Sequence, residues 1–424
     1  MTLPEYAKRL ESAVRTASIA GRTLLALDTN PVPASWDHVT KVDPEHGKEL
    51  PLAFPLFLAH TSAISVGGSQ DVTDRNTEET FDLVSAASVP ALHEPSAAGH
   101  VTEATRDHAD YLAVPEVLNG DSEALVGTLG RGIEYVREEL GPQLVEEKLG
   151  IPLDGDGFLG QRVANFAAAY LMEESIFEAY IIMNTDSAAA REANVTEDDL
   201  LTPQQAKERA LAAEYHLESE IIYLEYSGTF GGEEATEMLE AISDGVSWSR
   251  IWYGGGLDSR ENVQAVLDAG ADTVVVGDVF HDIATEEAEL VEQAREAFEE
   301  VPDDEALREW VEERVEVSET SAIRYLSTIP TVSNPVETAA TYLATGVGIA
   351  LEIEALADEL DTPSVAGLRR ELRDGPVPGE SAFEDVLGTD ARPVARRLTA
   401  TLLAEQFDLE TDDAFASRQL AVEL

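Results

Sequence analysis

The sequence predicts an α/β fold: a (βα)8 TIM-like barrel followed by a C-terminal all-helical domain. Short β-branched runs alternate with helix-compatible segments over about 250 residues, and beyond residue 302 only helical periodicity remains. Several runs are continuously apolar, as expected of parallel strands that are buried on both faces. A doubly wound open sheet is the alternative, although no Gly-x-Gly-x-x-Gly pattern opens a helix in this chain.

Eight runs rich in β-branched residues are the expected strands of the barrel. They are His38–Val42, Ala63–Val66, Val89–His93, Tyr111–Val117, Ala179–Met183, Glu220–Tyr226, Arg250–Tyr253 and Thr273–Val276. Between them, amphipathic helices are predicted at Glu78–Ala87, Pro203–Leu217, Glu233–Ser243 and Ser259–Ala269. The segment SAAGHVTEATRDHA after the third strand is short and interrupted by glycine, which argues against a regular helix there.

Three segments lie outside the repeated pattern. Residues 1–35 form an N-terminal helical extension, and an insertion at about 120–176 is far longer than an ordinary connection in such barrels. The insertion contains one charged and one apolar helical stretch. Residues 301–424 form a helical domain of unknown role. Because every motif described below precedes Asp282, we expect the chemistry to reside in the barrel, residues 36–300.

The charge balance is strongly acidic, with 83 acidic and 28 basic residues and a net charge of -55. Such a chain has no footprint for nucleic acid, which is therefore excluded as a partner. The composition, which includes only five lysines, fits a halophilic protein, because molar salt screens its self-repulsion. An acidic protein of ordinary cytosol is the alternative. The absence of cysteine excludes disulfides and thiolate metal sites.

The location is expected to be cytoplasmic. The first fifteen residues are charged and lack the apolar core of a signal peptide. The longest uncharged apolar stretch, Thr338–Leu351, is shorter than the roughly 18 residues that span a bilayer. Peripheral contact with a membrane surface remains compatible with the sequence, and we expect a homo-oligomer.

Glycines end the last two predicted strands, at Gly254–Gly256 and at Gly277. In (βα)8 barrels the loops after the seventh and eighth strands commonly hold a phosphate group. Glycine lets backbone N–H groups approach an anion closely. The two sites therefore predict one phosphate cradle, with simple chain turns as the alternative.

Polar side chains follow other predicted strands. Lys41 and Asp43 are two residues apart, and therefore on one face of an extended chain, and Ser69 follows the second strand. Glu225 interrupts the apolar sixth strand, and a buried acid without a partner is costly, which favours a functional role. A glutamate paired with a structural arginine is the alternative.

A metal site would be oxygen-ligated. None of the eight histidines has His-x-x-x-His spacing, and His38, His93 and His281 are expected to be packed side chains. We therefore favour Mg²⁺ at Asp43 over zinc.

Taken in order, the strand-end motifs resemble the archaeal geranylgeranylglyceryl phosphate synthase family, in its haloarchaeal form. They are HVTKVDPEHG, SVGGSQDVT, HEPS, VPEVLNG, AYIIMNTDSAAAR, IIYLEYSGTFGG, WYGGGLDSRE and ADTVVVGDV, within Trp36–Ala297. The resemblance implies a modified (βα)8 barrel and a prenyltransferase activity. Geranylgeranyl diphosphate and the hydroxyl of sn-glycerol 1-phosphate would be joined with release of diphosphate, making the first ether bond of archaeal membrane lipids.

The resemblance also implies roles for individual residues. Lys41 would contact glycerol phosphate, and Asp43 and Ser69 would bind Mg²⁺. The acceptor site would be lined by Tyr223, Leu224, Glu225, Tyr226, Ser227 and Gly228, with Glu225 as the base and Tyr223 beside it. The phosphate cradle would comprise Gly256, Gly277 and Asp278.

Two departures from the family pattern keep other readings open. The family commonly has asparagine in place of Asp278, and an acid beside a phosphate repels it unless only its N–H is used. The loop after VPEVLNG lacks a Lys-His pair and offers Arg131 instead. A paralogue with another prenyl chain or acceptor, a phosphosugar isomerase or aldolase, and an inactive barrel scaffold are therefore the alternatives.

Overall fold

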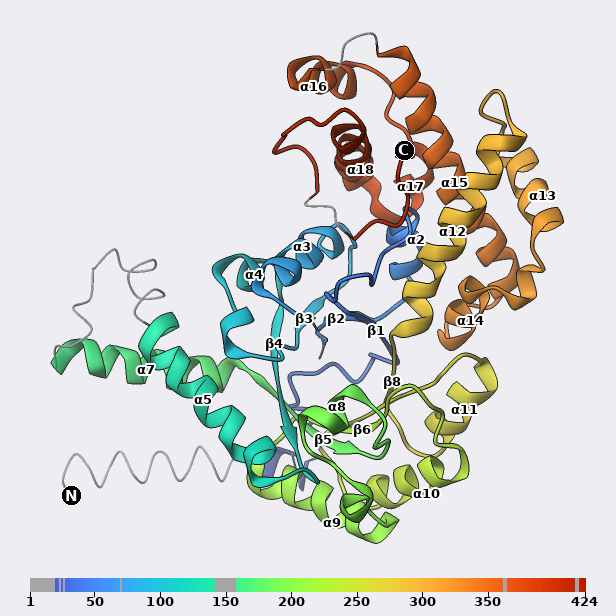
Figure 1. Cartoon of the computed structure of the whole chain (residues 1–424). Helices are drawn as coiled ribbons and strands as arrows, with labels where there is room; N and C mark the ends of the chain where they lie inside the picture. The colour runs from blue at the N-terminus through green and yellow to red at the C-terminus, as the bar shows by residue number, and fades with distance from the viewer. Residues whose placement is uncertain are drawn as a thin grey trace, which may run out of the picture.

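The computed structural model describes residues 20–22, 24–25, 27–68, 71–141, 158–360, 364–415 and 419–424. Within them, parallel strands β1 to β8 pair in chain order and β8 pairs with β1, which closes the barrel (Figure 1). The predicted (βα)8 barrel is confirmed. The strands are β1 (His38–Val42), β2 (Ala63–Val66), β3 (Ala91–His93), β4 (Tyr111–Val117), β5 (Ile176–Ile182), β6 (Ile221–Tyr226), β7 (Arg250–Gly255) and β8 (Thr273–Val276).

The helices around the barrel follow the expected alternation. They are α2 (Phe54–Leu58), α3 (Asp74–Val84), α4 (Glu103–His108), α8 (Ala188–Glu192), α9 (Pro203–Ala212), α10 (Gly232–Ser243), α11 (Arg260–Asp268) and α12 (Asp278–Ala297). Local capping fixes several starts: Thr202 caps α9, whose first residue is proline. The expectation of no regular helix after β3 is wrong for α4, because Thr102 and Thr105 form a capping box there.

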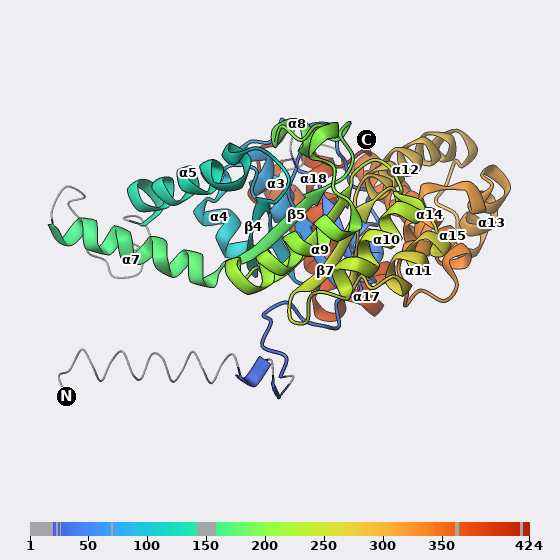
Figure 2. The same cartoon turned by 90° about the horizontal axis from the view of Figure 1, so that it is seen from below.

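The insertion between β4 and β5 forms helices that project from one side of the barrel (Figures 1 and 2). A π-helical turn, Glu123–Gly127, leads into α5 (Thr128–Tyr135) and a second π-helical turn, Val136–Leu140. The apolar stretch forms α7 (Phe158–Glu174). The last eight residues of the predicted charged helix, 142–149, lie outside the described residues.

The C-terminal region is helical, as predicted. It contains α13 (Asp304–Arg314), α14 (Ser321–Thr328), α15 (Pro335–Glu359), α16 (Val365–Asp374), α17 (Glu380–Leu387) and α18 (Ala391–Gln406). Its helices pack beside α2 and α12 (Figure 1), and α14 also contacts β1 through Tyr325. The division into a separate domain stays a prediction.

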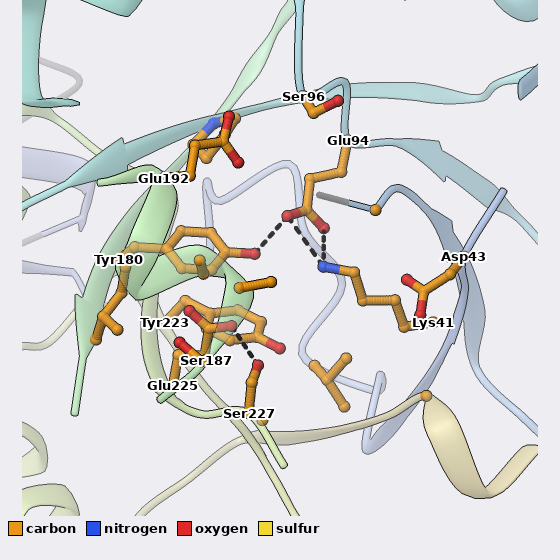
Figure 3. A pocket seen from close by; sticks show the side chains of 18 of the residues that line it. Lys41, Asp43, Glu94, Ser96, Tyr180, Ser187, Glu192, Tyr223, Glu225 and Ser227 are labelled. Atoms are coloured by element: carbon orange, nitrogen blue, oxygen red, sulfur yellow. Dashed lines mark hydrogen bonds and ion pairs between the residues drawn. The ribbon is translucent and has the colours of Figure 1, made fainter. Parts of the chain in front are cut away.

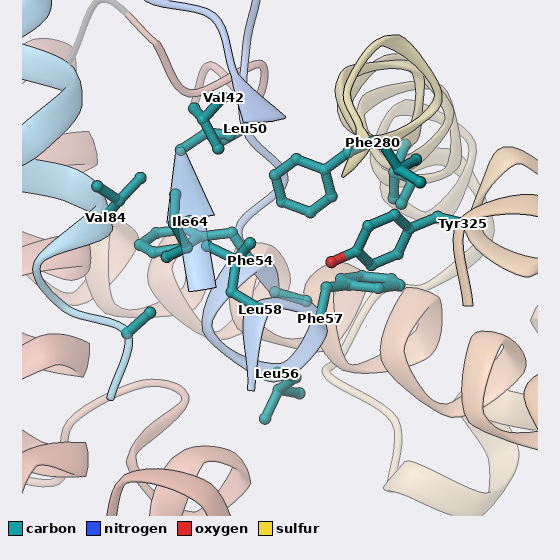
Figure 4. Packing of buried hydrophobic residues seen from close by; sticks show 14 of the residues in the cluster. Val42, Leu50, Phe54, Leu56, Phe57, Leu58, Ile64, Val84, Phe280 and Tyr325 are labelled. Atoms are coloured by element: carbon teal, nitrogen blue, oxygen red, sulfur yellow. The ribbon is translucent and has the colours of Figure 1, made fainter. Parts of the chain in front are cut away.

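One hydrophobic cluster joins the barrel to these helices. Phe54 and Phe57 of α2, Phe280 of α12 and Tyr325 of α14 are all fully buried in it (Figure 4). The Tyr325 hydroxyl also hydrogen bonds with the Thr40 hydroxyl on the outer face of β1, at 2.7 Å. The C-terminal helices thus complete the outer layer beside β1, where α2 has only five residues.

Helix α15 is long and apolar enough to cross a membrane by length and composition alone. However, 56% of its most apolar window is buried inside the protein. It packs against α12, α13 and α14, as a core helix of a folded protein does.

Candidate active site

A cavity of about 1230 Å³ opens at the ends of the strands that carry the predicted motifs. Its inner part lies inside the barrel, where Lys41, Glu94, Tyr180, Tyr223 and Glu225 meet (Figure 3). A second part extends past β4 toward the insertion. The structure therefore gathers the main predicted polar residues into one polar chamber with an attached apolar arm.

Glu94, which directly follows β3, is the centre of the hydrogen-bond network in the chamber. Both of its carboxylate oxygens accept from Lys41 Nζ at 3.2 Å. It also accepts from the Ser65 hydroxyl at 3.1 Å and from the Tyr180 hydroxyl at 2.6 Å. Burial by itself lowers the pKa of Lys41, but Glu94 raises it well above its usual value, so the lysine stays charged. The sequence motifs do not single out Glu94; its signal is an acid directly after an apolar strand.

Glu225 on β6 has the features expected of a general base. Its side chain is 5% exposed, one oxygen accepts from the Ser227 hydroxyl, and Oε2 has no partner among the described residues. Burial raises the pKa of Glu225, whereas the charge of Lys41 opposes that rise. A raised pKa brings a carboxylate closer to the range where it exchanges protons with substrate.

Tyr223 and Tyr180 form the wall beside Glu225. Their rings stack with centroids 4.4 Å apart, and burial raises the pKa of both hydroxyls well above the usual value. A Cβ on residue 254 would lie 2.1 Å from the Tyr223 hydroxyl oxygen. Gly254 is therefore required by the position of Tyr223. Both tyrosines stay neutral, and Tyr180 donates its hydroxyl hydrogen to Glu94.

The predicted acceptor site is wrong at Leu224 and Tyr226. Both are buried in the outer cluster and neither lines the cavity. The Tyr226 hydroxyl donates to Glu234 on α10 at 3.0 Å. The physical reason is the alternation of side chains along a strand, which sends Tyr223 and Glu225 inward and their neighbours outward. Ser227 and Gly228 do line the cavity.

The predicted phosphate cradle is altered at Gly256. Its N–H donates to the Thr229 carbonyl at 2.7 Å, and a Cβ there would lie 3.0 Å from Phe230 N. Gly256 is thus needed for a close approach of the loop after β6, and its N–H is already paired. Gly256 nevertheless lines the cavity, so its contact with substrate stays a prediction, without this N–H as the donor.

The other half of the cradle lies at the first turn of α12, which Gly277 precedes. The first N–H groups of a helix have no acceptor within it and favour an anion. The Asp278 carboxylate accepts from Lys48 Nζ at 2.6 Å, and its side chain is 68% exposed. The acid is therefore neutralised at the rim, while its backbone N–H stays at the helix start.

Asp43 lines the cavity beside this helix start. Its N–H donates to Nε2 of His281, whose Nδ1 hydrogen bonds with the Glu49 carbonyl, both at 3.0 Å. Burial raises the pKa of Asp43 to about 7; Lys41 opposes this, and Glu45 adds to it. Its carboxylate has no hydrogen-bond or ion-pair partner among the described residues, which leaves it open to a cation.

The fit to Mg²⁺ rests on this carboxylate. Ser69, the second predicted ligand, lies outside the described residues. In the part of the chain that is described, no three carboxylates or imidazoles come together as a metal site. Mg²⁺ commonly takes one or two carboxylates and completes its shell with water and substrate phosphate, so the donor set at Asp43 fits that ion.

The three histidines near strands are packed, as expected. His38 hydrogen bonds with the hydroxyls of Thr61 and Thr328, at 2.9 and 3.0 Å. His93 is buried against Phe81, with ring centroids 5.1 Å apart. Burial lowers the pKa of both imidazoles to about 3, so they stay neutral.

The apolar arm of the cavity was not predicted. It runs along the outer side of β4, and its lining residues come from that strand, the segment before it and the insertion helices: Val101, Leu112, Val114, Ile133, Val136, Leu140 and Leu171. Several separate segments between residues 101 and 171 build it, so no single motif marks it. Arg131 does not line it; this arginine pairs with Glu123 on the surface of the insertion.

Comparison with known proteins gives the lineage of this site. The PcrB family model matches residues 33–297, which include all eight strands and the polar chamber. The chain belongs to the PcrB family. This confirms the resemblance that the strand-end motifs predict.

Relatives of this PcrB chain include enzymes of haloarchaea. It is 33% identical to the geranylgeranylglyceryl phosphate synthase of Haloquadratum walsbyi, over 58% of this chain and 88% of the relative. It is 30% identical to the same enzyme of Natronomonas pharaonis, over 62% and 97%. A crystal structure of the Thermoplasma acidophilum synthase in complex with sn-glycerol-1-phosphate matches with 22% identity and a TM-score of 0.42, over 58% and 86%.

Proposed function

We propose that this protein joins geranylgeranyl diphosphate to the hydroxyl of sn-glycerol 1-phosphate. The observation that carries the proposal is the two-part cavity, in which a polar chamber continues into an apolar arm. A phosphorylated triol needs the first part and a long isoprenoid chain needs the second. Membership of the PcrB family and the names of the relatives support the same reaction.

The acceptor is held at the chamber side. Its phosphate lies at the first turn of α12, next to Lys41, and its reacting hydroxyl faces Glu225 Oε2. Lys41 is already charge-paired with Glu94, so that pair fixes the lysine before substrate arrives. Holding both partners in one cavity turns a bimolecular step into a positioned one.

In the reaction the acceptor hydroxyl oxygen bonds to the allylic carbon of the donor. The bond from that carbon to the diphosphate oxygen breaks, and its electron pair leaves with diphosphate. The hydroxyl proton passes to Glu225 Oε2. Ser227 donates to the other oxygen of that carboxylate and so directs the free oxygen toward the acceptor.

Asp43 and Ser69 are the residues that would hold Mg²⁺. When bound there, the ion would supply positive charge that stabilises the leaving diphosphate. Asp43 is placed for this by the His281 hydrogen bond to its backbone.

The apolar arm also separates this function from its rivals. A phosphosugar isomerase or aldolase uses a phosphate cradle but has no need for a lining of seven apolar residues beyond it. Prenyl chain length, the cytoplasmic location, a homo-oligomeric state and peripheral membrane contact remain predictions.

The test is an assay of the full chain in molar salt with geranylgeranyl diphosphate, sn-glycerol 1-phosphate and Mg²⁺. We expect the prenylated glycerol phosphate by mass spectrometry, with an equal amount of diphosphate released. Farnesyl and longer diphosphates, and sn-glycerol 3-phosphate, serve as controls for chain and acceptor. Turnover of a phosphosugar without prenyl transfer would favour the isomerase or aldolase reading, and no turnover of any substrate would favour the scaffold.

A further inference from the structure

We propose that Arg324, from the C-terminal helical region, binds the phosphate of the acceptor at the mouth of the cavity. This inference rests on the proposed function and extends it, because it assigns a substrate contact to a region outside the family match at residues 33–297. Arg324 lies on α14 and lines the same cavity as Gly277 and the first turn of α12.

Helix α14 is held in place from three directions. The Tyr325 hydroxyl bonds with Thr40 on β1, and the Ser321 N–H donates to Glu286 on α12 at 2.8 Å. Arg260, the first residue of α11, donates to the carbonyl of Val332 at 2.6 Å, just beyond the end of α14. The helix that carries Arg324 is therefore fixed between α12 and the start of α11.

Arg324 points away from this packed face. Its neighbour Tyr325 is fully buried, whereas Arg324 is exposed and lines the cavity beside Asn262 of α11 and Asp282 of α12. These two helices follow β7 and β8, the side of a (βα)8 barrel where phosphate groups commonly bind. A guanidinium at this rim has the fork of donors that matches a phosphate.

Three of the four described basic side chains that line the cavity already have a partner within the protein. Lys41 pairs with Glu94, Lys48 pairs with Asp278, and Arg191 donates to the Asp186 carbonyl at 2.7 Å. The Arg324 side chain has no hydrogen-bond or ion-pair partner among the residues that the structure describes. In a chain with 83 acidic and 28 basic residues, a cation left unpaired at a substrate cavity is one that an incoming anion can use.

The need for such a cation follows from the charge of this rim. Asp258 and Asp282 line the cavity where the acceptor phosphate would lie, and Lys48 pairs only with Asp278. The N–H of Gly256 is already bonded to the Thr229 carbonyl, so the loop after β7 offers one donor fewer than the sequence suggests. Arg324 supplies the charge and the donors that this half of the cradle lacks.

The experiment compares Arg324→Gln, Arg324→Lys and Arg370→Gln in the full chain at molar salt. Arg370 is an exposed arginine of the same region that does not line the cavity, so its variant controls for loss of one charge. We expect the KM for sn-glycerol 1-phosphate to rise about tenfold to a hundredfold in Arg324→Gln, the usual range for a charge-assisted hydrogen bond. The acceptor KM of Arg324→Lys should lie between those of the wild type and Arg324→Gln. The kcat and the KM for the prenyl donor should change much less.

Calorimetric titration with inorganic phosphate measures the affinity of the same contact without any turnover. Weaker phosphate binding by folded Arg324→Gln, but not by Arg370→Gln, is the expected result. Unchanged phosphate affinity and unchanged acceptor KM would overturn the inference, and so would a rise confined to the donor KM. If the wild type binds phosphate through Arg324 but makes no prenylated product, the proposed function fails while this assignment stands.

Discussion

The inside of the barrel and the cluster between the barrel and the C-terminal helices are both buried, but they differ in chemistry. The inside holds Glu94, Glu178 and Glu225 around Lys41, with carboxylate oxygens of Glu178 and Glu225 left without a partner among the described residues. The cluster around Phe57 and Tyr325 is mainly apolar (Figure 4). The buried ionisable groups beside it are hydrogen-bonded: His38 bonds with hydroxyls, and Glu287 accepts from the backbone N–H groups of Leu52 and Ala53. Buried acids lower stability and apolar packing raises it. The contrast indicates that the interior serves the reaction and that the outer cluster maintains the fold.

The largest effect on stability should come from Phe57→Ala in the outer cluster. Phe57 is fully buried, and its ring meets those of Tyr325 and Tyr342 with centroids 6.1 and 5.2 Å apart. Phenylalanine-to-alanine changes in cores lower the free energy of unfolding by about 3–5 kcal/mol. Denaturant unfolding in molar salt measures it, with Phe166→Ala as control, because Phe166 is 68% exposed. A loss as small as that of the control would show that this cluster does not stabilise the fold.

Asp43→Asn should act on turnover, and not by weakening the fold. It removes the charge that would hold Mg²⁺, and we expect at least about a 100-fold loss, about 2.7 kcal/mol of barrier. Because burial raises the pKa of Asp43 to about 7, its ionisation opposes folding as the pH rises from about 4 to 7. The variant should therefore be at least as stable as the wild type at pH 8. Full activity of the variant, or of the wild type in chelator, would refute the metal assignment.

A smaller effect is expected in the apolar arm. Ile133 is partly buried and lines that arm, so Ile133→Ser should raise the KM for the prenyl donor about tenfold. The KM for glycerol phosphate should stay within about twofold, because the acceptor contacts lie in the polar chamber. Steady-state kinetics with each substrate varied in turn makes the comparison. Equal changes in both constants would mean that the arm does not hold the donor.

The smallest effect should follow Arg131→Gln. Arg131 pairs with Glu123 on the surface of the insertion, where its side chain is 62% exposed. Exposed ion pairs contribute little, so unfolding free energy and turnover should change by less than about 0.5 kcal/mol. A large loss of activity would show that this arginine replaces the missing Lys-His pair after all.

The sequence was sufficient to predict the barrel and the positions of the carboxyl ends of its strands. Runs such as Thr273–Val276 are β-branched and bounded by turn residues, so their place follows from local chemistry. Side chains alternate between the two faces of a strand, and this rule also placed Tyr223 and Glu225 on one face. The same rule, applied to Leu224 and Tyr226, would have excluded both from the acceptor site.

Other features depend on contacts between distant segments, which a local pattern does not contain. Glu94 binds Lys41 from 53 residues away, and only the closed sheet brings them together. The paired N–H of Gly256 depends on the path of the loop after β6. Helical periodicity predicted that residues 301–424 are helical, but not that Tyr325 packs on β1 while Arg324 lines the cavity.

The most direct test of this contrast is Glu225→Gln, measured for both turnover and stability on folded protein in molar salt. Glutamine keeps the size but cannot accept the proton, so turnover should fall roughly 10²- to 10⁴-fold. The wild type should lose activity as the pH falls through the raised pKa of Glu225, because the base must be ionised. Unfolding free energy should be unchanged or higher at neutral pH, since a buried charge is removed. Turnover within about threefold of the wild type, less than 0.7 kcal/mol of barrier, with a clear loss of stability would show that Glu225 is structural.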